Sequence, residues 1–371
     1  EIDFIRIGSE LSCDPPFRSR LIENVLEACS TRREVHACIE GCRVFVGTVA
    51  TFSSKTDMFR LKTFDVAIVD EATQILEPQL LGLLCARDVA GNNAIGKFIL
   101  IGDHKQLPAV VLQSESQSEV CEECLQSIGL YNLKDSLFER LYRTVSADHS
   151  SPTTQRFYDM LCRQGRMNVE VAQFPNRAFY GGLLEAVGLP HQQGKLVLAP
   201  GLESDEFADI LVHRVAFLPS VPETPSQSAK INHFEARLTA RLAASVYRQY
   251  EASNSGFNSA LTLGVITPYR SQIALIKREI AALGIPVLND ILVDTVERFQ
   301  GSERDVIIYS FCVNRTYQLK FLANLTEEKG VWIDRKLNVA LTRARKQLFM
   351  TGVPHLLRQN PIYADLLDTV L

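Results

Sequence analysis

An apolar run that ends in two carboxylates places the strongest constraint on the fold of this chain. Residues 65–74 read DVAIVDEATQ, so residues 66–69 are apolar and Asp70 and Glu71 follow directly. A short run of this kind is typical of a strand buried on both faces of a parallel sheet. Ligands of open α/β sheets collect outside the carboxyl ends of the strands. The two carboxylates are therefore candidate functional groups, although acidic residues also open many helices.

A second apolar run repeats the arrangement. Residues 97–108 read KFILIGDHKQLP, and a helix-length segment over residues 75–87 separates the two runs. In the second half, apolar runs at residues 261–266, 291–293, 306–309 and 347–350 alternate with helical patterns. Strands that alternate with helices favour parallel sheets with crossover helices. The pattern predicts two doubly wound α/β domains, with the ligand site in the cleft that they form.

Length and charge narrow the class of protein. The chain has 371 residues, a hydrophobic content of 46% and a net charge of -4. This length suits two domains that each bury a core. The net charge excludes a histone-like electrostatic binder but allows a groove that follows one nucleic-acid strand. No apolar run approaches the roughly 20 residues of a membrane span, and no signal peptide opens the chain. We expect no membrane partner.

The nine cysteines suggest a reducing compartment, because an odd number does not make a disulfide framework. The sequence thus predicts an intracellular protein. Two groups have spacings that also occur in zinc sites; they are the pair Cys121 and Cys124, and the set Cys29, His36, Cys38 and Cys42. A structural zinc site needs four converging ligands, so we expect neither group to be one.

A polar segment divides the chain. Residues 146–152 read SADHSSP, which is typical of a linker, and a capped helix is expected just before it at residues 135–141. We therefore expect domains over residues 1–150 and 151–371. The first residue is Glu rather than Met, which suggests numbering that starts inside a longer protein.

Five stretches together resemble a known family. Residues 70–74 and 102–108 resemble motifs II and III of superfamily 1 helicases, most closely the up-frameshift-like branch, superfamily 1B. Residues 164–168 (QGRMN) with 174–180, residues 295–305 (TVERFQGSERD) and residues 337–345 (LNVALTRAR) resemble motifs IV, V and VI. The last is the most specific. The resemblance covers nearly the whole chain and implies two RecA-like domains of a P-loop NTPase helicase core, the first incomplete.

The resemblance assigns catalytic roles. It implies that Asp70 holds Mg²⁺, directly or through water, and that Glu71 polarises the attacking water. Gln106, expected on the first domain, would sense the γ-phosphate of ATP or order the water. Arg166 and Arg343 would act as arginine fingers, because a guanidinium stays charged and presents a planar fork of donors.

The resemblance also assigns binding roles. The implied nucleotide contacts are Gly102, Asp103, Gln300, Gly301, Glu303 and Arg345. The implied contacts to single-stranded nucleic acid are Thr48, Pro108, Thr267, Pro268, Tyr269 and Thr295. Simpler interpretations stay open. Glu303 fits a surface carboxylate, Arg343 and Arg345 fit a solvated helix face, and Thr48 fits a plain strand end. Tyr269 also fits a core or cleft-wall aromatic.

The sequence departs from the family in three places. The phosphate loop, Gly-x-x-x-x-Gly-Lys-Ser/Thr, is absent from the 371 residues. We therefore expect this motif and the first strand of the first domain to lie upstream of these residues. Without them we expect little ATPase activity. Gly165 stands where the family usually has a Tyr that stacks on adenine, which leaves the nucleotide preference open. Asn168 stands where the family usually has His.

These observations predict the C-terminal part of an ATP-dependent helicase motor, which we expect to be a monomer that hydrolyses ATP to move along single-stranded RNA or DNA. A hinge cycle around ATP would drive the movement. Two other functions fit the sequence. One is a non-catalytic module that binds nucleic acid or a partner, and the other is the helicase part of a nuclease–helicase in DNA repair or defence. The motifs do not encode the choice between RNA and DNA.

Overall fold

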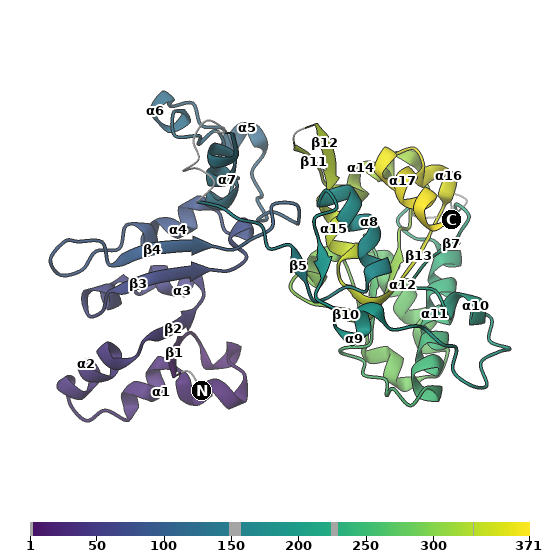
Figure 1. Cartoon of the computed structure of the whole chain (residues 1–371), viewed down its shortest axis with the longest axis horizontal. Coiled ribbons are helices and arrows are strands. Elements are labelled where there is room, and N and C mark those ends of the chain that lie inside the picture. Colours follow the sequence, from purple (N-terminus) through teal and green to yellow (C-terminus); the bar gives the residue numbers. More distant parts are fainter. Residues whose placement is uncertain (1–2, 148–156, 224–228, 329) are drawn as a thin grey trace. The chain divides into compact units, whose positions relative to one another are not determined.

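The computed structural model describes residues 3–147, 157–223, 229–328 and 330–371. It divides into two compact units (Figure 1). Unit 1 comprises Glu1–His104 and Pro108–Asp159, and unit 2 comprises Lys105–Leu107 and Met160–Leu371. The domain boundary expected at residues 150 and 151 lies outside the described residues.

Unit 2 is built on a five-stranded sheet in the order β7-β13-β10-β8-β9, and all of its pairings are parallel. The strands are β7 (Val215–Pro219), β8 (Leu263–Ile266), β9 (Leu292–Asp294), β10 (Arg304–Ser310) and β13 (Ala344–Gly352). The four strands expected in this half of the chain are therefore confirmed, and β7 is the fifth.

Helices cover both faces of this sheet because its strands are apolar on both sides. Along β10, Val306 and Ile308 pack into one core with α11 (His233–Ala252) and α12 (Arg270–Ala282). Ile307 and Tyr309 pack into the opposite core with α8 (Val169–Phe179), α15 (Arg335–Leu341) and α17 (Pro361–Val370). Alternate residues of one strand thus enter two cores. The prediction of a doubly wound, RecA-like α/β fold is confirmed.

Shorter elements complete unit 2. They are β5 (Arg163–Gln164), β6 (Glu185–Ala186), α9 (Pro190–Gln193), α10 (Ala208–Leu211), α13 (Val296–Phe299), α14 (Leu319–Leu322), β11 (Leu325–Glu328), β12 (Val331–Asp334) and α16 (Pro354–Leu357). β5 pairs in parallel with β6, and β11 and β12 form an antiparallel hairpin. Asp334, the last residue of β12, caps α15 by accepting hydrogen bonds from the amides of Lys336 and Leu337.

Unit 1 contains two parallel strand pairs. β1 (Phe4–Ile7) pairs with β2 (Val44–Gly47), and β3 (Phe64–Val69) pairs with β4 (Ile95–Leu100). Its helices are α1 (Ile22–Glu27), α2 (Arg32–Gly41), α3 (Val49–Ser54), α4 (Glu77–Leu84), α5 (Glu115–Ser118), α6 (Glu123–Gln126) and α7 (Leu137–Ala147). α4 is the crossover helix expected from β3 to β4. α7 is the expected capped helix, and the Ser136 hydroxyl accepts from the Glu139 amide at 3.1 Å.

The expectation that residues 66–69 are buried on both faces is wrong. Val66 is 43% exposed and Ile68 is 66% exposed, whereas Val69 is 6% exposed. On β4, Ile99 is 43% exposed, and Ile101 just beyond the strand is 42% exposed. Ala67, Val69 and Ile95 pack into the core of unit 1. Exposed and buried residues alternate along these strands because nothing among the described residues covers the second face of the strand pair.

The described residues show neither a membrane-spanning helix nor a metal cluster. None of their helices has both the length and the apolar composition to cross a membrane. The nine cysteines are free thiols, and no three His, Cys, Asp or Glu side chains in the described parts converge to hold a metal ion.

A buried carboxylate lies at the start of α11. Glu235 is fully buried, and it accepts hydrogen bonds from the Ser220 hydroxyl (2.9 Å), the Ser310 hydroxyl (2.7 Å) and the Cys312 amide (2.9 Å). Cys312 has a φ of 49°, a left-handed conformation that non-glycine residues rarely adopt. Burial raises the pKa of the Glu235 carboxyl to about 7, and its three donors oppose that rise.

We predict that Glu235 makes the stability of the protein dependent on pH. Its raised pKa means that the folded state binds the proton more tightly than the unfolded state does. The contribution of this protonated carboxyl to stability is therefore full below pH 4.5 and is lost as the pH rises to about 7. Glu235→Gln should remove this loss and raise the free energy of unfolding above pH 7 by at most about 3 kcal/mol. Urea unfolding across this pH range measures the effect.

Glu235→Leu is the contrasting variant. It leaves three donors without their acceptor and should be less stable than the wild type at every pH. Parallel curves of stability against pH for the wild type and Glu235→Gln would contradict the prediction.

Candidate functional site

The acidic turn after β3 is held in a strained conformation. Glu71 has φ 50° and ψ 38°, again in the left-handed region. The Glu71 amide donates to Asp70 Oδ1 at 3.0 Å, and Gln74 Nε2 donates to Glu71 Oε2 at 2.7 Å. Both carboxylate residues are exposed at the carboxyl end of the strand. Strain of this kind is concentrated at functional sites, because it fixes side chains in directions that relaxed backbone does not provide.

The turn after β4 packs directly against the acidic turn. The Ala72 amide donates to the Ile101 carbonyl at 2.7 Å, and the Ile101 amide donates to the Val69 carbonyl at 2.8 Å. A Cβ at Gly102 would lie 3.0 Å from Thr73 Cγ2 and 3.1 Å from the Thr73 amide nitrogen. Gly102 therefore allows the two turns to approach. Asp103 follows as a half-buried residue.

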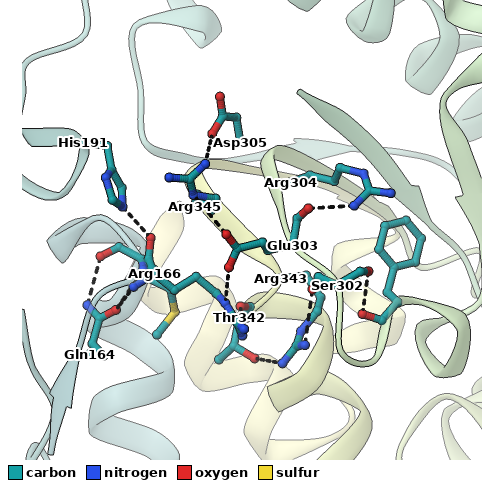
Figure 2. A network of polar contacts seen from close by, with 12 residues as sticks. Gln164, Arg166, His191, Ser302, Glu303, Arg304, Asp305, Thr342, Arg343 and Arg345 are labelled. Carbon is teal, nitrogen blue, oxygen red and sulfur yellow. Dashed lines mark hydrogen bonds and ion pairs between the residues drawn. The ribbon is translucent and has the colours of Figure 1, made fainter. Parts of the chain in front are cut away.

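In unit 2, charged residues from motifs IV, V and VI come together in what we name the arginine cluster: Arg166, Arg343, Arg345, Glu303 and Asp305 (Figure 2). Arg166 Nε donates to Glu303 Oε2 at 2.7 Å, and Arg345 Nε lies 3.4 Å from Glu303 Oε1. Arg345 Nη1 contacts Asp305 Oδ1 at 3.2 Å. Glu303 thus neutralises two guanidinium groups at once, and the nucleotide contact expected for it stays a prediction.

Arg343 is anchored inside unit 2. The residue is 2% exposed, and its guanidinium donates to the Val339 carbonyl (3.1 Å), the Ser302 carbonyl (3.3 Å) and Gln106 Oε1 (3.1 Å). The solvated helix face that remained open from sequence is thus wrong for Arg343. Arg166 is less buried than Arg343, because its side chain is 35% exposed.

Gln106 belongs to unit 2 rather than to the first domain, where we expected it. The reason lies in its contacts. Besides the bond from Arg343 to Gln106, Asn338 Nδ2 donates to the Lys105 carbonyl at 2.8 Å, and Gln300 Nε2 donates to the Leu107 carbonyl at 3.4 Å. Gly301 next to Gln300 has a φ of 74°, which favours glycine.

Further side chains hold the backbone around Arg166, and the sequence did not single out His191 or Gln192 among them. Gln164 Oε1 accepts from the amides of Arg166 (3.0 Å) and Met167 (2.8 Å), and His191 Nε2 lies 2.9 Å from the Arg166 carbonyl (Figure 2). Asn168 caps α8 and donates through Nδ2 to the Gln192 carbonyl at 2.9 Å. No spacing in the sequence links residues 191–192 to the motif at 164–168, so only the fold reveals these contacts.

The proposed nucleic-acid contacts of unit 2 lie at the opposite edge of the sheet. Thr267, Pro268 and Tyr269 follow β8, Thr295 follows β9, and the Thr267 amide donates to the Asp294 carbonyl at 3.1 Å. These residues therefore meet at the carboxyl ends of the strands. Glu303 and Arg343 instead precede β10 and β13, whose first paired residues are Arg304 and Ala344.

Exposure separates these candidates. Pro268, Tyr269 and Thr295 are half-buried, whereas Thr267 is fully buried and presents no surface. In unit 1, the Thr48 hydroxyl accepts from the Thr51 amide at 3.2 Å and caps α3, and Pro108 is half-buried.

The chain matches known protein families over most of its length. Two family models, both described as an AAA domain, match residues 133–355 and residues 19–114. The first match alone spans more than half of the chain. The chain belongs to this AAA-domain family.

Curated relatives of this AAA-domain chain carry helicase names. The "Uncharacterized ATP-dependent helicase MJ0104" of Methanocaldococcus jannaschii is 29% identical over 94% of this chain and 44% of its own length. The "DNA replication ATP-dependent helicase/nuclease DNA2" of Xenopus laevis is 30% identical over 96% of this chain and 31% of its own length. The "DNA replication ATP-dependent helicase/nuclease JHS1" of Arabidopsis thaliana is 27% identical over 100% of this chain and 24% of its own length. The chain spans less than half the length of these relatives.

We predict that Arg343 stabilises unit 2 more than Arg166 does. Arg343→Ala leaves buried acceptors without a donor and should lower the free energy of unfolding by about 2–4 kcal/mol. Arg166→Ala breaks a half-exposed ion pair and should cost less than about 1 kcal/mol. Urea unfolding followed by the fluorescence of Trp332, the single Trp of the chain, reports on unit 2. Equal losses for the two variants would contradict the buried anchoring of Arg343.

Proposed function

We propose that this chain is the motor part of an ATP-dependent helicase or translocase that moves along single-stranded nucleic acid. The arginine cluster carries the proposal. Arg166 and Arg345 share the single carboxylate of Glu303 at the edge of the sheet where Arg343 meets Gln106. Guanidinium groups that share a partly exposed carboxylate can exchange it for a phosphate, because both anions accept paired N–H donors.

The acidic turn of unit 1 supplies the complementary chemistry. Asp70 would hold Mg²⁺ and Glu71 would polarise the attacking water. One exposed carboxylate suits Mg²⁺, which keeps several waters and binds through one or two carboxylates together with substrate phosphates. When bound, the ion would neutralise charge on the phosphates of ATP. The bond from Gln74 to Glu71 would orient the carboxylate that acts on the water.

Phosphoryl transfer to water is catalysed mainly by positioning and by stabilising charge. Arg166 is the better candidate for a finger, since it is partly exposed and its backbone is fixed by Gln164 and His191. Arg343 would act from a buried position through its contact with Gln106. Displacement of Glu303 would free Arg166 and Arg345 for the nucleotide.

We further propose that the motor is of the up-frameshift-like type and that its phosphate loop lies outside these 371 residues. The sequence contains no such loop, and unit 1 presents a contiguous set of exposed apolar strand residues at Val66, Ile68 and Ile99. A soluble domain rarely leaves such a set uncovered. A further strand and helix that cover this face would account for the exposure.

A second candidate is the helicase part of a helicase/nuclease that acts on DNA. The names of two of the relatives favour it, since both are called DNA replication ATP-dependent helicase/nuclease. ATP hydrolysis by the 371-residue chain and by the full-length protein, each with single-stranded DNA or RNA, tests both candidates. Stimulation by DNA alone favours the second. No nucleotide binding by the full-length protein would point to a non-catalytic module.

We predict that Glu71→Gln in the full-length protein lowers kcat for ATP hydrolysis by at least about 100-fold, because the amide cannot accept the water's proton. The Kd for ATP should change by less than about 3-fold, since the loss falls on the chemical step. Steady-state turnover and equilibrium binding of a fluorescent ATP analogue measure the two quantities.

Glu119→Gln serves as the control, because Glu119 is an exposed carboxylate of the same unit outside the acidic turn. It should leave both quantities at the wild-type values. Normal turnover by Glu71→Gln would remove Glu71 from the mechanism.

A further inference from the structure

Four buried carboxamide side chains form a connected network at the carboxyl edge of the sheet in unit 2. Asn232, Gln272, Asn314 and Gln318 are each at most 2% exposed. We name them the amide network. They come from the start of α11, the first turn of α12 and the segment after β10. None of the roles proposed above uses them.

Gln318 uses all of its hydrogen-bonding capacity. Its Oε1 accepts from the amides of Asn314 and Arg315, both at 2.9 Å. Its Nε2 donates to the Ala229 carbonyl at 2.9 Å and to the Tyr269 hydroxyl at 3.1 Å. A primary amide has two N–H donors and two lone pairs, so the orientation of this side chain is fully determined.

The rest of the network makes Gln318 rigid. Asn314 Oδ1 accepts from Asn232 Nδ2 at 2.9 Å. Gln272 accepts from the Asn232 amide at 2.9 Å through Oε1 and donates to the Asn232 carbonyl at 3.0 Å through Nε2. Three segments that are distant in sequence are therefore tied together by buried bonds, which are costly to break.

Tyr269 is where the network reaches the surface. It lies directly after the Thr267-Pro268 turn that follows β8, at the N-terminus of α12, and it is half-buried. Parallel sheets bind their ligands at this edge. A tyrosine whose hydroxyl is held in place has lost its rotational freedom before a ligand arrives, so binding costs less entropy.

We propose that Gln318 is a positioning residue that holds the Tyr269 ring as a stacking platform for a base of single-stranded nucleic acid. The proposal rests on the proposed function, because it takes such a strand as the ligand of unit 2. Gln318 is 1% exposed and does not touch the strand. Aromatic rings stack on every base, so this contact adds affinity without sequence preference.

The test is a double-mutant cycle on the 371-residue protein. Tyr269→Phe removes only the hydroxyl, and Gln318→Met removes the amide while it keeps the length of the side chain. Fluorescence anisotropy measures the binding of a labelled oligothymidylate or oligouridylate of about 20 nucleotides, a length that exceeds typical single-strand site sizes. Each single variant should bind about 3- to 10-fold more weakly, and the double variant no more weakly than the weaker single variant.

Two further readouts separate positioning from general damage. Tyr269→Ala should weaken binding by about 10- to 100-fold, the range expected for one lost stacking contact. The slope of log K against log salt should stay at the wild-type value in all these variants, because no phosphate contact is removed.

Gln249→Leu is the matched control. Gln249 is another buried carboxamide of unit 2, bonded to the Ala199 amide and the Val197 carbonyl away from Tyr269. It should lower the thermal midpoint but leave binding unchanged.

The outcomes distinguish the two proposals. Wild-type affinity of Gln318→Met together with weak binding by Tyr269→Ala would overturn the positioning role and leave the proposed function intact. Additive losses in the double variant, or equal weakening by Gln249→Leu, would also overturn it. No binding of either oligonucleotide by the wild-type protein would overturn both proposals.

Discussion

The parallel pairing of β8, β10 and β13 decides which residues of unit 2 meet. In a parallel sheet all strands begin at one edge and end at the other, so residues that directly precede the strands are separated from residues that directly follow them by the length of the strands. Glu303 and Arg343 precede β10 and β13, and Thr267 and Tyr269 follow β8. The charged cluster and the aromatic turn therefore occupy opposite edges. In the proposed motor, these two edges of one sheet would provide separate places for the nucleotide and the nucleic-acid strand.

Buried polar groups give these edges their rigidity. Glu235 at the start of α11 accepts hydrogen bonds from Ser220 after β7 and from Cys312 after β10, and the amide network joins the same helix to α12. At the other edge, Arg343 is fixed by carbonyls and by Gln106. Each of these groups would be costly if it lacked a partner, so the satisfied networks favour one arrangement of the loops. Arg166 and Glu303 are instead partly exposed, as the proposed exchange of Glu303 for a phosphate would require.

Strand positions follow from the local pattern of apolar residues in the sequence. Apolar runs located β3, β4, β8, β9, β10 and β13, because an apolar run of strand length can be identified from its own residues. The interpretation of Val66 and Ile68 as buried failed, because burial depends on what packs against a strand and not on its composition. The placement of Gln106 failed for a similar reason. Proximity in sequence to β4 indicated one unit, whereas bonds from Arg343, Asn338 and Gln300 hold its segment in the other.

The sequence by itself determined the residue types that phosphate chemistry requires and the order in which they occur along the chain. It could not determine that Glu303 pairs with both Arg166 and Arg345, because Arg166 and Glu303 are 137 positions apart in the sequence. Nor could it show that Gln318 supports Tyr269 or that His191 and Gln164 orient Arg166. Such contacts depend on the register of the strands and on the path of the loops. Only the tertiary structure fixes these, because it sets the distance of each donor from its acceptor.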